Sequence, residues 1–296
     1  MKRFITTAAV FAVSSLALAG SVLAAGAAGA HYENEKQQWS FGGFFGQYDK
    51  AQLQRGFQVY KEVCSACHGL ERVRFRNLVE KGGPEFPEAA VKKLAAEWPN
   101  QPLAGPNDDG RTTDKAGNLL TRPALLADPI LGPYRNEKEA RAAQNGALPP
   151  DLSLMAKARD LHNAAIWFKH VGLMAKDIAI GYQEGGADYI YNLLVAYADP
   201  PADVKLADGM NYNKAFPGNQ IAMVPPLNKD SPVKYENGKG SLEENARDVA
   251  AFLAWSADPK LNERKAMGWS VMLYLLITCL LLYLGKKRIW ERVGAH

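Results

Sequence analysis

Cysteine is scarce in this chain, and its scarcity excludes several kinds of site. The 296 residues include three cysteines, Cys64, Cys67 and Cys279. A structural zinc site needs four ligands, usually with a second Cys or His pair, and Cys279 lies inside a long apolar run. A disulfide between Cys64 and Cys67 would close a very small, strained loop. The two neighbouring thiols therefore need another explanation.

Strand patterns and repeats are also missing. We find no strand pattern of any length and no internal repeat in the sequence. A thioredoxin-type redox pair requires a βαβ context around its C-x-x-C motif, so this class is excluded. Glycine and proline are frequent from 69 to 150, and a loop region that long is unusual unless it wraps something. We therefore expect a mostly α domain with long loops, in which this region forms the wall of a cofactor pocket.

The body of the chain lacks net charge, although the whole chain carries a formal charge of +4. Two basic residues lie in 1–30, and four basic residues and one acidic residue lie in 286–296. The rest of the chain contains 29 basic and 30 acidic residues. A nucleic-acid-binding surface needs basic residues gathered on one face of the fold, so this function is excluded.

The N-terminal segment has the pattern of a secretory signal peptide. Residues 1–30 combine a short basic start, an apolar run and a tail of small residues. Cleavage after Ala24 and cleavage after Ala30 both fit this pattern. The alternative is a first transmembrane helix. The end of the segment is rich in alanine and glycine and has no flanking charge, which disfavours this alternative.

A second apolar segment predicts a membrane anchor near the C-terminus. Residues 266–285 contain no charged side chain, and twenty helical residues span about 30 Å, the thickness of a bilayer's hydrocarbon core. A buried core helix seldom stays apolar on every face, which disfavours that alternative. Three basic residues follow at once, so the positive-inside rule predicts a cytoplasmic tail at 286–296 and an exported domain before residue 266.

Helical patterns cover much of the remaining chain. Asp49 is a suitable N-cap for a helix that runs directly into Cys64, with Leu53, Phe57 and Tyr60 on one apolar face. Ser241 and Glu244 predict a capping box for a helix over 241–259. Further helices are expected over 87–98, 137–146, 152–180 and 187–201.

The stretch VCSACHG, residues 63–69, contains the motif that carries chemistry. Cys64, Cys67 and His68 match C-x-x-C-H, the attachment signature of c-type haem. The two thiols add to the two vinyl groups of one porphyrin, and the following imidazole then lies under the iron as a ligand. The sequence therefore predicts one covalently bound haem c.

The sixth iron ligand is less directly indicated. Electron-transfer haems fill this position, most often with Met or His. Met223 lies in a loop between Pro217 and Pro225-Pro226, and a weak thioether ligand binds well when a stiff backbone presents it. His162 and His170 rank second, because their segment also fits a solvated amphipathic helix. The other histidine and methionines considered are His31, Met155, Met174, Met210 and Met267.

The order of these features resembles the cytochrome c1 family, the haem subunits of cytochrome bc1 complexes, in its α-proteobacterial form. The resemblance covers nearly all of the chain after residue 30, and several of its segments are more specific than the haem motif. The matching segments are VCSACHGL, the Arg122-Pro123 pair of TRPALL, ARAAQNGALPPDLS, GGADYIYNLLVAYADPP, AFPGNQIAMVPPL and the C-terminal anchor.

The resemblance implies a role for each matching residue. Cys64 and Cys67 would form the thioether links, His68 would be the proximal iron ligand and Met223 the distal one. Arg122 would lie near the haem propionates, although a surface arginine in an exposed ion pair is the simpler alternative. The resemblance also divides the chain into the signal peptide, a cytochrome c-like haem domain at 31–265 with an insertion at 154–183, the anchor and the tail.

The resemblance implies electron transfer without substrate chemistry of the chain's own. The haem would accept an electron from a Rieske iron–sulfur protein and pass it to a soluble cytochrome c or c2, in a dimeric membrane complex with cytochrome b. In a bacterium the haem domain would lie in the periplasm. Acidic residues that could attract a basic partner are Asp108, Asp109, Glu184, Glu243 and Glu244.

Three other functions stay open. An anchored cytochrome c subunit of a terminal oxidase shares the signal, motif and anchor, but would lack GALPPDLS and ADYIYNLL. A haem peroxidase would have an open or switchable iron site, often with a second C-x-x-C-H, and this chain has one. An anchored protein with a structural C-x-x-C would carry no haem.

Overall fold

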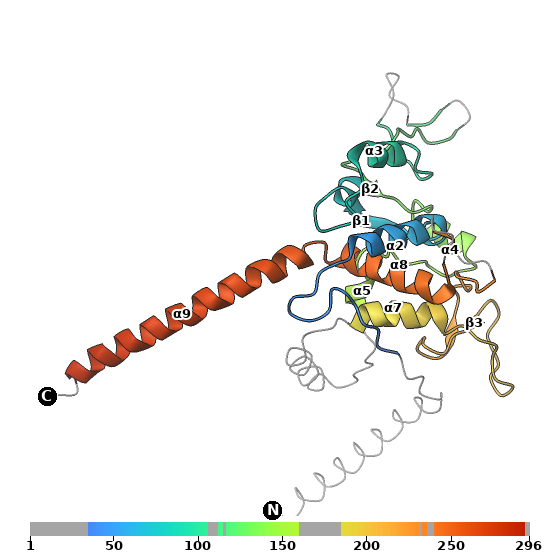
Figure 1. The fold of residues 1–296 in the computed structure, drawn as a ribbon. Coiled ribbons are helices and arrows are strands. Elements are labelled where there is room, and N and C mark those ends of the chain that lie inside the picture. The colour runs from blue at the N-terminus through green and yellow to red at the C-terminus, as the bar shows by residue number, and fades with distance from the viewer. Residues whose placement is uncertain are drawn as a thin grey trace, which may run out of the picture.

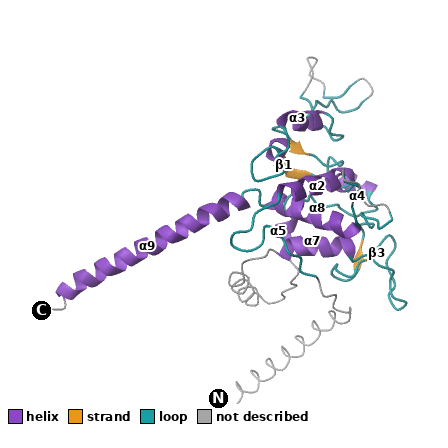
Figure 2. Cartoon of the chain, viewed as in Figure 1, coloured by secondary structure: helices purple, strands orange, loops and turns teal. Residues whose placement is uncertain are grey.

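The computed structural model describes residues 35–105, 112–114, 117–159, 185–230, 233–235 and 240–293. These residues form a mostly helical domain from which one long helix projects (Figures 1 and 2). The α-helices are α2 (Lys50–Glu62), α3 (Glu88–Ala96), α4 (Glu137–Ala143), α5 (Met155–Ala158), α7 (Gly185–Val195), α8 (Leu242–Ala257) and α9 (Leu261–Val293). The 3-10 helices are η1 (Cys64–Ala66) and η2 (Phe75–Leu78), and the strands are β1 (Leu70–Arg74), β2 (Pro129–Ile130), β3 (Asn211–Tyr212) and β4 (Gln220–Ile221).

Two of the predicted helix starts are confirmed in detail. The Asp49 carboxylate accepts hydrogen bonds from the backbone N–H groups of Ala51 and Gln52 at the start of α2. Ser241 and Glu244 form the expected capping box at the start of α8. Local sequence alone therefore determines where the two central helices begin.

Helices α2 and α8 pack against each other as an antiparallel pair. The hydroxyl of Tyr48, just before α2, donates to the carbonyl of Ala254 near the end of α8. Gly56 in the middle of α2 lies so close to α8 that a Cβ atom there would be 2.1 Å from the carbonyl oxygen of Asp248. Glycine allows this approach because it has no side chain. Phe252 then packs between Phe57 and Tyr60, with ring centroids 5.6 and 5.8 Å away.

An ion pair reinforces the same crossing. The Arg55 guanidinium donates to both carboxylate oxygens of Asp248, at 2.7 and 3.2 Å. Asp248 is buried, so this paired geometry satisfies a charge that would otherwise be costly inside the domain. The hydrogen bond to Asp248 raises the pKa of Arg55.

Helix α7 forms a third layer on the other side of α8 (Figure 1). Its buried Asp188 accepts hydrogen bonds from the Trp39 indole N–H at 2.8 Å and from the Gln37 backbone N–H at 2.9 Å. Gly186 approaches the end of α5 so closely that a Cβ atom would be 1.7 Å from the Ala156 carbonyl oxygen. The N-terminal segment of the domain is thus fixed to α7, and α7 to α5.

The structure contains four short strands although the sequence shows no strand pattern. β1 pairs antiparallel with β2, and β3 pairs antiparallel with β4. The reason is length: β1 has five residues, of which Leu70 and Val73 are buried, and each of the other three strands has two. Segments this short are paired by their surroundings and carry no alternating pattern that sequence reasoning can detect.

The predicted boundaries of the other helices are mostly confirmed, with two differences. α7 ends at Val195, well before the prolines at 200 and 201, because Tyr197 pairs with Asn213 in an antiparallel bridge that needs extended backbone. α2 ends at Glu62, and a separate 3-10 turn carries Cys64. The helix expected over 152–180 is wrong as one continuous element: α5 ends at Ala158, and Arg159 has extended backbone. Residues 160–184 lie outside the described part of the chain.

Helix α9 is the one candidate membrane span among the described residues. It has 33 residues and begins five residues before the predicted anchor, and its apolar window is exposed on all sides. Asp258, in the short connection from α8, is held on both sides by Lys157 at 2.9 Å and by Arg264 of α9. The predicted signal peptide at 1–30 lies outside the described residues.

Arg122 and Asp128 close a turn in the long loop region. Two guanidinium nitrogens of Arg122 donate to the two carboxylate oxygens of Asp128 at 2.6 and 2.7 Å. The backbone N–H of Leu125 donates to the same carboxylate at 2.7 Å. The hydrogen bond from Arg122 lowers the pKa of Asp128 from 3.8 to about 2.

Replacing Gly56 by alanine should destabilise the domain. The added Cβ would meet backbone atoms of α8, and overpacking of this kind costs about 1–3 kcal/mol, more than the roughly 1 kcal/mol that alanine gains in helix propensity. Guanidinium unfolding of the full chain in detergent measures the change. Gly105→Ala is the matched control, because a Cβ there meets nothing within 4 Å, and equal effects of both variants would contradict this account.

Asp128→Asn should lower the free energy of unfolding by less than about 1 kcal/mol at pH 7, because the pair is partly exposed. The pKa of Asp128 is lowered on folding, so its contribution is present above pH 4 and is lost as the pH falls towards 2. The difference between variant and parent should fall to about half by pH 3. Glu88→Gln, in the exposed pair with Lys92, is the control, and a difference that grows as the pH falls would contradict the assignment.

Candidate functional site

The C-x-x-C-H residues lie on the turn where α2 ends. The carbonyl oxygen of Cys64 accepts hydrogen bonds from the backbone N–H groups of Cys67 at 3.1 Å and of His68 at 2.9 Å. This turn gathers both thiols and the imidazole around one carbonyl. It lies at the end of α2 away from α9, because α2 runs antiparallel to α8 and α9 follows α8. The 13 residues of α2 separate it from the α9 end by about 20 Å.

The two thiols are available for covalent chemistry. Neither forms a disulfide among the described cysteines, and both residues are half-buried. Burial raises the pKa of the Cys64 thiol to about 12, and the nearby Cys67 adds to this effect. Gln144 at the end of α4 lies 3.8 Å from the Cys67 sulfur and also contacts the Tyr134 hydroxyl at 2.6 Å. The uncharged thiol is therefore the resting form of Cys64.

A backbone carbonyl fixes the orientation and protonation of His68. Its Nδ1 lies 2.7 Å from the carbonyl oxygen of Pro150. A carbonyl oxygen only accepts, so Nδ1 carries the proton and donates it, which leaves Nε2 with a free lone pair. Burial lowers the pKa of His68, partly offset by the Pro150 hydrogen bond. The ring is thus held neutral and oriented, as histidine metal ligands usually are.

The backbone around His68 is held by the segment 150–153. The Leu152 N–H donates to the Gly69 carbonyl at 3.0 Å, and the Asp151 carboxylate accepts from the Glu71 N–H at 2.8 Å. The Tyr60 hydroxyl, one helical turn before the motif, donates to the His68 carbonyl at 3.0 Å. Because the main chain on both sides of His68 is bonded, its imidazole has little freedom to turn away.

Two glycines allow two backbone segments to approach each other closely just after the C-x-x-C-H motif. Gly69 and Gly132 approach so closely that a Cβ atom on either would lie 2.8 Å from the backbone nitrogen of the other. This contact brings the strand β1 that follows the motif against the loop after β2. The long loop region between β1 and α4 therefore returns to the C-x-x-C-H motif, and its role as the wall of a cofactor pocket stays a prediction.

Met223 is presented by a second, independently braced loop. It follows the β3–β4 hairpin and is half-buried, whereas the next residue, Val224, is 66% exposed. The Tyr197 hydroxyl, just after α7, donates to the Met223 carbonyl at 3.0 Å. Burial raises the pKa of Tyr197, so its hydroxyl remains a donor at any physiological pH. Met223 is thus held on the α7 side of the domain, while His68 follows α2.

The other candidate ligands have different surroundings. Met155 packs against the hydrophobic core, and Met210 and Met267 are exposed by 38% and 65%. His31, His162, His170 and Met174 lie outside the described residues. Among the described residues, no group of three or more His, Cys, Asp or Glu side chains is placed to hold a metal ion.

Arg122 forms an ion pair with the Asp128 carboxylate. Both of its terminal nitrogens bond to Asp128, and one also donates to the Pro123 carbonyl at 3.2 Å. The sequence leaves a surface ion pair open as the simpler explanation of Arg122. The structure contains that ion pair. A second role towards the propionates of a haem stays a prediction.

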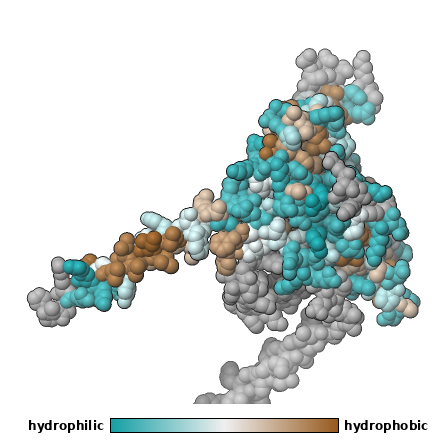
Figure 3. Space-filling model, viewed as in Figure 1, coloured by the Kyte–Doolittle hydropathy of each residue, from teal (hydrophilic) through white to brown (hydrophobic). Residues whose placement is uncertain are grey.

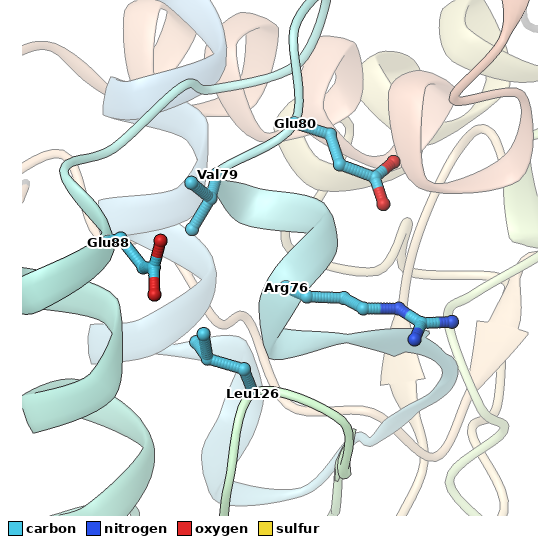
Figure 4. Close-up of a pocket in the computed structure, with 5 residues that line it drawn as sticks. All are labelled: Arg76, Val79, Glu80, Glu88 and Leu126. Carbon is cyan, nitrogen blue, oxygen red and sulfur yellow. The ribbon is translucent and has the colours of Figure 1, made fainter.

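A surface pocket elsewhere contains none of these residues. It lies between η2, the start of α3 and the loop before β2, and Figure 4 shows Glu80 and Arg76 at one side and Glu88 at the other. Its lining residues are Arg76, Val79, Glu80, Glu88 and Leu126. The mixed charges of this lining point to no particular ligand.

The described residues fit a c-type haem. Cys64 and Cys67 offer two thiols that form no disulfide among the described cysteines, and His68 offers an unprotonated Nε2 because its Nδ1 is bonded to the Pro150 carbonyl. Sequence reasoning found these residues but missed those that hold them, namely Tyr60, Pro150, Asp151 and Tyr197. GALPPDLS was noticed as a segment, yet nothing in one sequence says that the Pro150 carbonyl would face His68, 82 residues away.

Known proteins resemble this chain over most of its length. The sequence profile of the Cytochrome C1 family matches residues 39–293. The chain is 45% identical to the cytochrome c1 of Blastochloris viridis over 258 residues, which cover 87% of this chain and 86% of that protein. It is 41% identical to the cytochrome c1 of Rhodospirillum rubrum over 302 residues, covering 94% and 97%.

A longer relative has the same similarity over part of its length. The chain is 41% identical over 255 residues to a protein of Bradyrhizobium diazoefficiens named cytochrome b/c1, which covers 86% of this chain and 35% of that protein. The family match over most of the chain and the extent of identity to these relatives lead to one conclusion: the chain belongs to the Cytochrome C1 family.

Proposed function

We propose that this chain is the electron-carrying haem subunit of a quinol–cytochrome c oxidoreductase, the cytochrome bc1 complex. One observation carries the proposal: two cysteines that form no disulfide among the described residues precede an imidazole whose Nδ1 is fixed by the Pro150 carbonyl, so that Nε2 is free to bind iron. Membership of the Cytochrome C1 family supports the same function. The haem is of c type, one per chain, and linked to Cys64 and Cys67.

The chain's own residues would support electron transfer by fixing the two proposed iron ligands, His68 and Met223, in position. A haem iron supplies one-electron redox chemistry, and fixed axial ligands keep its rearrangement small. His68 is held through Nδ1 and through its own carbonyl, which Tyr60 binds. Met223 is the proposed second ligand, and Tyr197 fixes its carbonyl. Methionine as the partner of histidine raises the potential, which suits a carrier that receives electrons from a Rieske centre.

The proposed partners follow from the family. Cytochrome b would be the membrane partner, and the relative named cytochrome b/c1 supports this pairing. A Rieske iron–sulfur protein would deliver the electron, and a soluble cytochrome c or c2 would remove it, within a dimeric complex. The signal peptide at 1–30 and the basic residues after 285 favour a periplasmic haem domain, with α9 crossing the inner membrane.

Acidic side chains could assist the encounter with a basic partner. Glu243 and Glu244 are exposed on the first turn of α8, the helix end that lies nearest the C-terminal end of α2. Glu244 also caps the helix, so Glu243 is the better candidate for steering. Asp108, Asp109 and Glu184 lie outside the described residues.

Arg122 has a proposed second role beside its ion pair. A guanidinium keeps further N–H groups when two nitrogens are bonded to one carboxylate. We infer that Arg122 orients a haem propionate while Asp128 holds the arginine in place.

The alternative functions fit less well. A terminal-oxidase subunit would not need the segments 150–153 and 185–195, which here hold His68 and form the α7 layer. A peroxidase would keep its sixth position open, whereas the Met223 loop is braced by Tyr197 and by two following prolines.

Covalent attachment is tested by replacing the thiols. Cys64→Ala with Cys67→Ala should abolish haem staining of the full chain on a denaturing gel, because only thioether links survive denaturation. Mass spectrometry of the parent chain should show one added haem. Cys279→Ser is the matched control and should keep the stain, and a stained double variant or an unmodified parent mass would exclude haem c.

The distal ligand is tested by Met223→Leu. Loss of the thioether should change the visible spectrum and lower the midpoint potential by on the order of 0.1 V, within the roughly 0.8 V that axial ligands span. Redox titration of the purified holoprotein measures both. Met210→Leu, at an exposed methionine, should leave both unchanged, and an unaltered potential in Met223→Leu would disprove the ligand assignment.

A further inference from the structure

The segment before α2 presents two exposed phenylalanines on a closed loop. Residues 40–46 read SFGGFFG, and Phe44 and Phe45 are 62% and 76% exposed. The Gln47 N–H donates to the Ser40 carbonyl at 3.0 Å and closes the base of the loop. Gly46 approaches Gly42 so closely that a Cβ atom would be 1.9 Å from the Gly42 carbonyl oxygen. Two bulky aromatic rings therefore project from a compact turn.

Buried residues fix this loop on both sides. Before it, the Trp39 indole is bonded to buried Asp188 of α7. After it, the Tyr48 N–H donates to the side chain of Asn262 at the start of α9 at 3.1 Å, and the Tyr48 and Phe41 rings lie 4.9 Å apart. Because both ends of the loop are held, the Phe44 and Phe45 rings cannot turn into the domain. Their exposure is therefore a property of the folded loop.

The loop is also attached to the beginning of the candidate membrane helix. The Lys265 ammonium donates to the carbonyl oxygens of Phe41 and Gly43, both at 2.6 Å. The Phe45 ring contacts the Trp269 ring of α9 edge-on, with centroids 5.8 Å apart. Trp269 is the fourth residue of the uncharged run at 266–285, where tryptophan is typical of a membrane interface. Figure 3 shows apolar surface along α9 and on the edge of the domain from which it leaves.

We propose that residues 40–46 are a second membrane contact, in which Phe44 and Phe45 enter the lipid interface beside α9. The loop and the helix are continuous through the Phe45–Trp269 contact, so a bilayer that surrounds the start of α9 reaches the loop as well. Lipid covers the two exposed rings without a shaped partner surface, which suits a short turn with two aromatic side chains. The inference rests on α9 spanning the membrane. It does not depend on the haem or on electron transfer.

Depth-dependent quenching by nitroxide-labelled lipids tests this contact. Phe44→Cys and Phe45→Cys, each in a Cys279→Ser background, are labelled with an environment-sensitive fluorophore, and the full chain is reconstituted into phosphatidylcholine vesicles. Peptide mass spectrometry verifies that the label is on the introduced cysteine and not on Cys64 or Cys67. Lys93→Cys in α3, which lies at the top of the domain in Figure 1 whereas α9 leaves it toward the lower left, is the matched control in the same background. The parent chain labelled at Cys279 is the positive control for the bilayer.

We expect interfacial nitroxides to quench the labels at 44 and 45 at least twofold more strongly than the label at 93. Quenching equal to that at 93 would overturn the proposal. Strong quenching in the isolated subunit that disappears in the assembled complex would also overturn it, because a protein subunit would then cover the loop. Absence of quenching at Cys279 would reject the membrane position of α9, and the loop's contact with it.

Discussion

The crossing of α2 and α8 at Gly56 is the constraint on which the rest of the domain depends. A side chain at this position would collide with the backbone of α8, so glycine sets the distance between the two helices. The Arg55–Asp248 pair and the Phe252 ring then fix their rotation and register. α7 packs on the opposite side of α8, and the turn that carries Cys64, Cys67 and His68 extends from the end of α2. The position of the haem motif is therefore set by core packing some distance from it.

The site itself is built largely from loops that main-chain hydrogen bonds make rigid. Pro150 contributes only a carbonyl, yet that carbonyl determines which nitrogen of His68 can bind a metal. Tyr60 and Tyr197 likewise act through main-chain atoms, one on His68 and the other on Met223. A domain with little regular structure around these residues can in this way restrict the motion of two side chains that are distant in sequence. Such restriction suits the proposed role of His68 and Met223 as ligands of a one-electron carrier.

Sequence reasoning identified the parts of the molecule that have local signals. The caps of α2 and α8 and the apolar run of α9 follow from short patterns, and each predicted a feature that the structure contains. The C-x-x-C-H motif is equally local, and the covalent haem that it predicts stays a prediction. The strands β1 to β4 were missed because they are two to five residues long and pair through contacts distant in sequence. The early end of α7 depends on the bridge between Tyr197 and Asn213, and the pairing of Arg122 depends on the fold of its turn. No short pattern encodes these tertiary contacts.

The connection between α8 and α9 is only three residues long, Asp258, Pro259 and Lys260, and Asp258 is bonded to both Lys157 and Arg264. Such a joint resists bending, so the domain cannot swing about its anchor as it would on a flexible tether. The distance and tilt of the haem motif relative to the bilayer are then nearly constant. In the proposed electron-transfer role, any long-range movement then falls to the electron donor and the electron acceptor rather than to this domain.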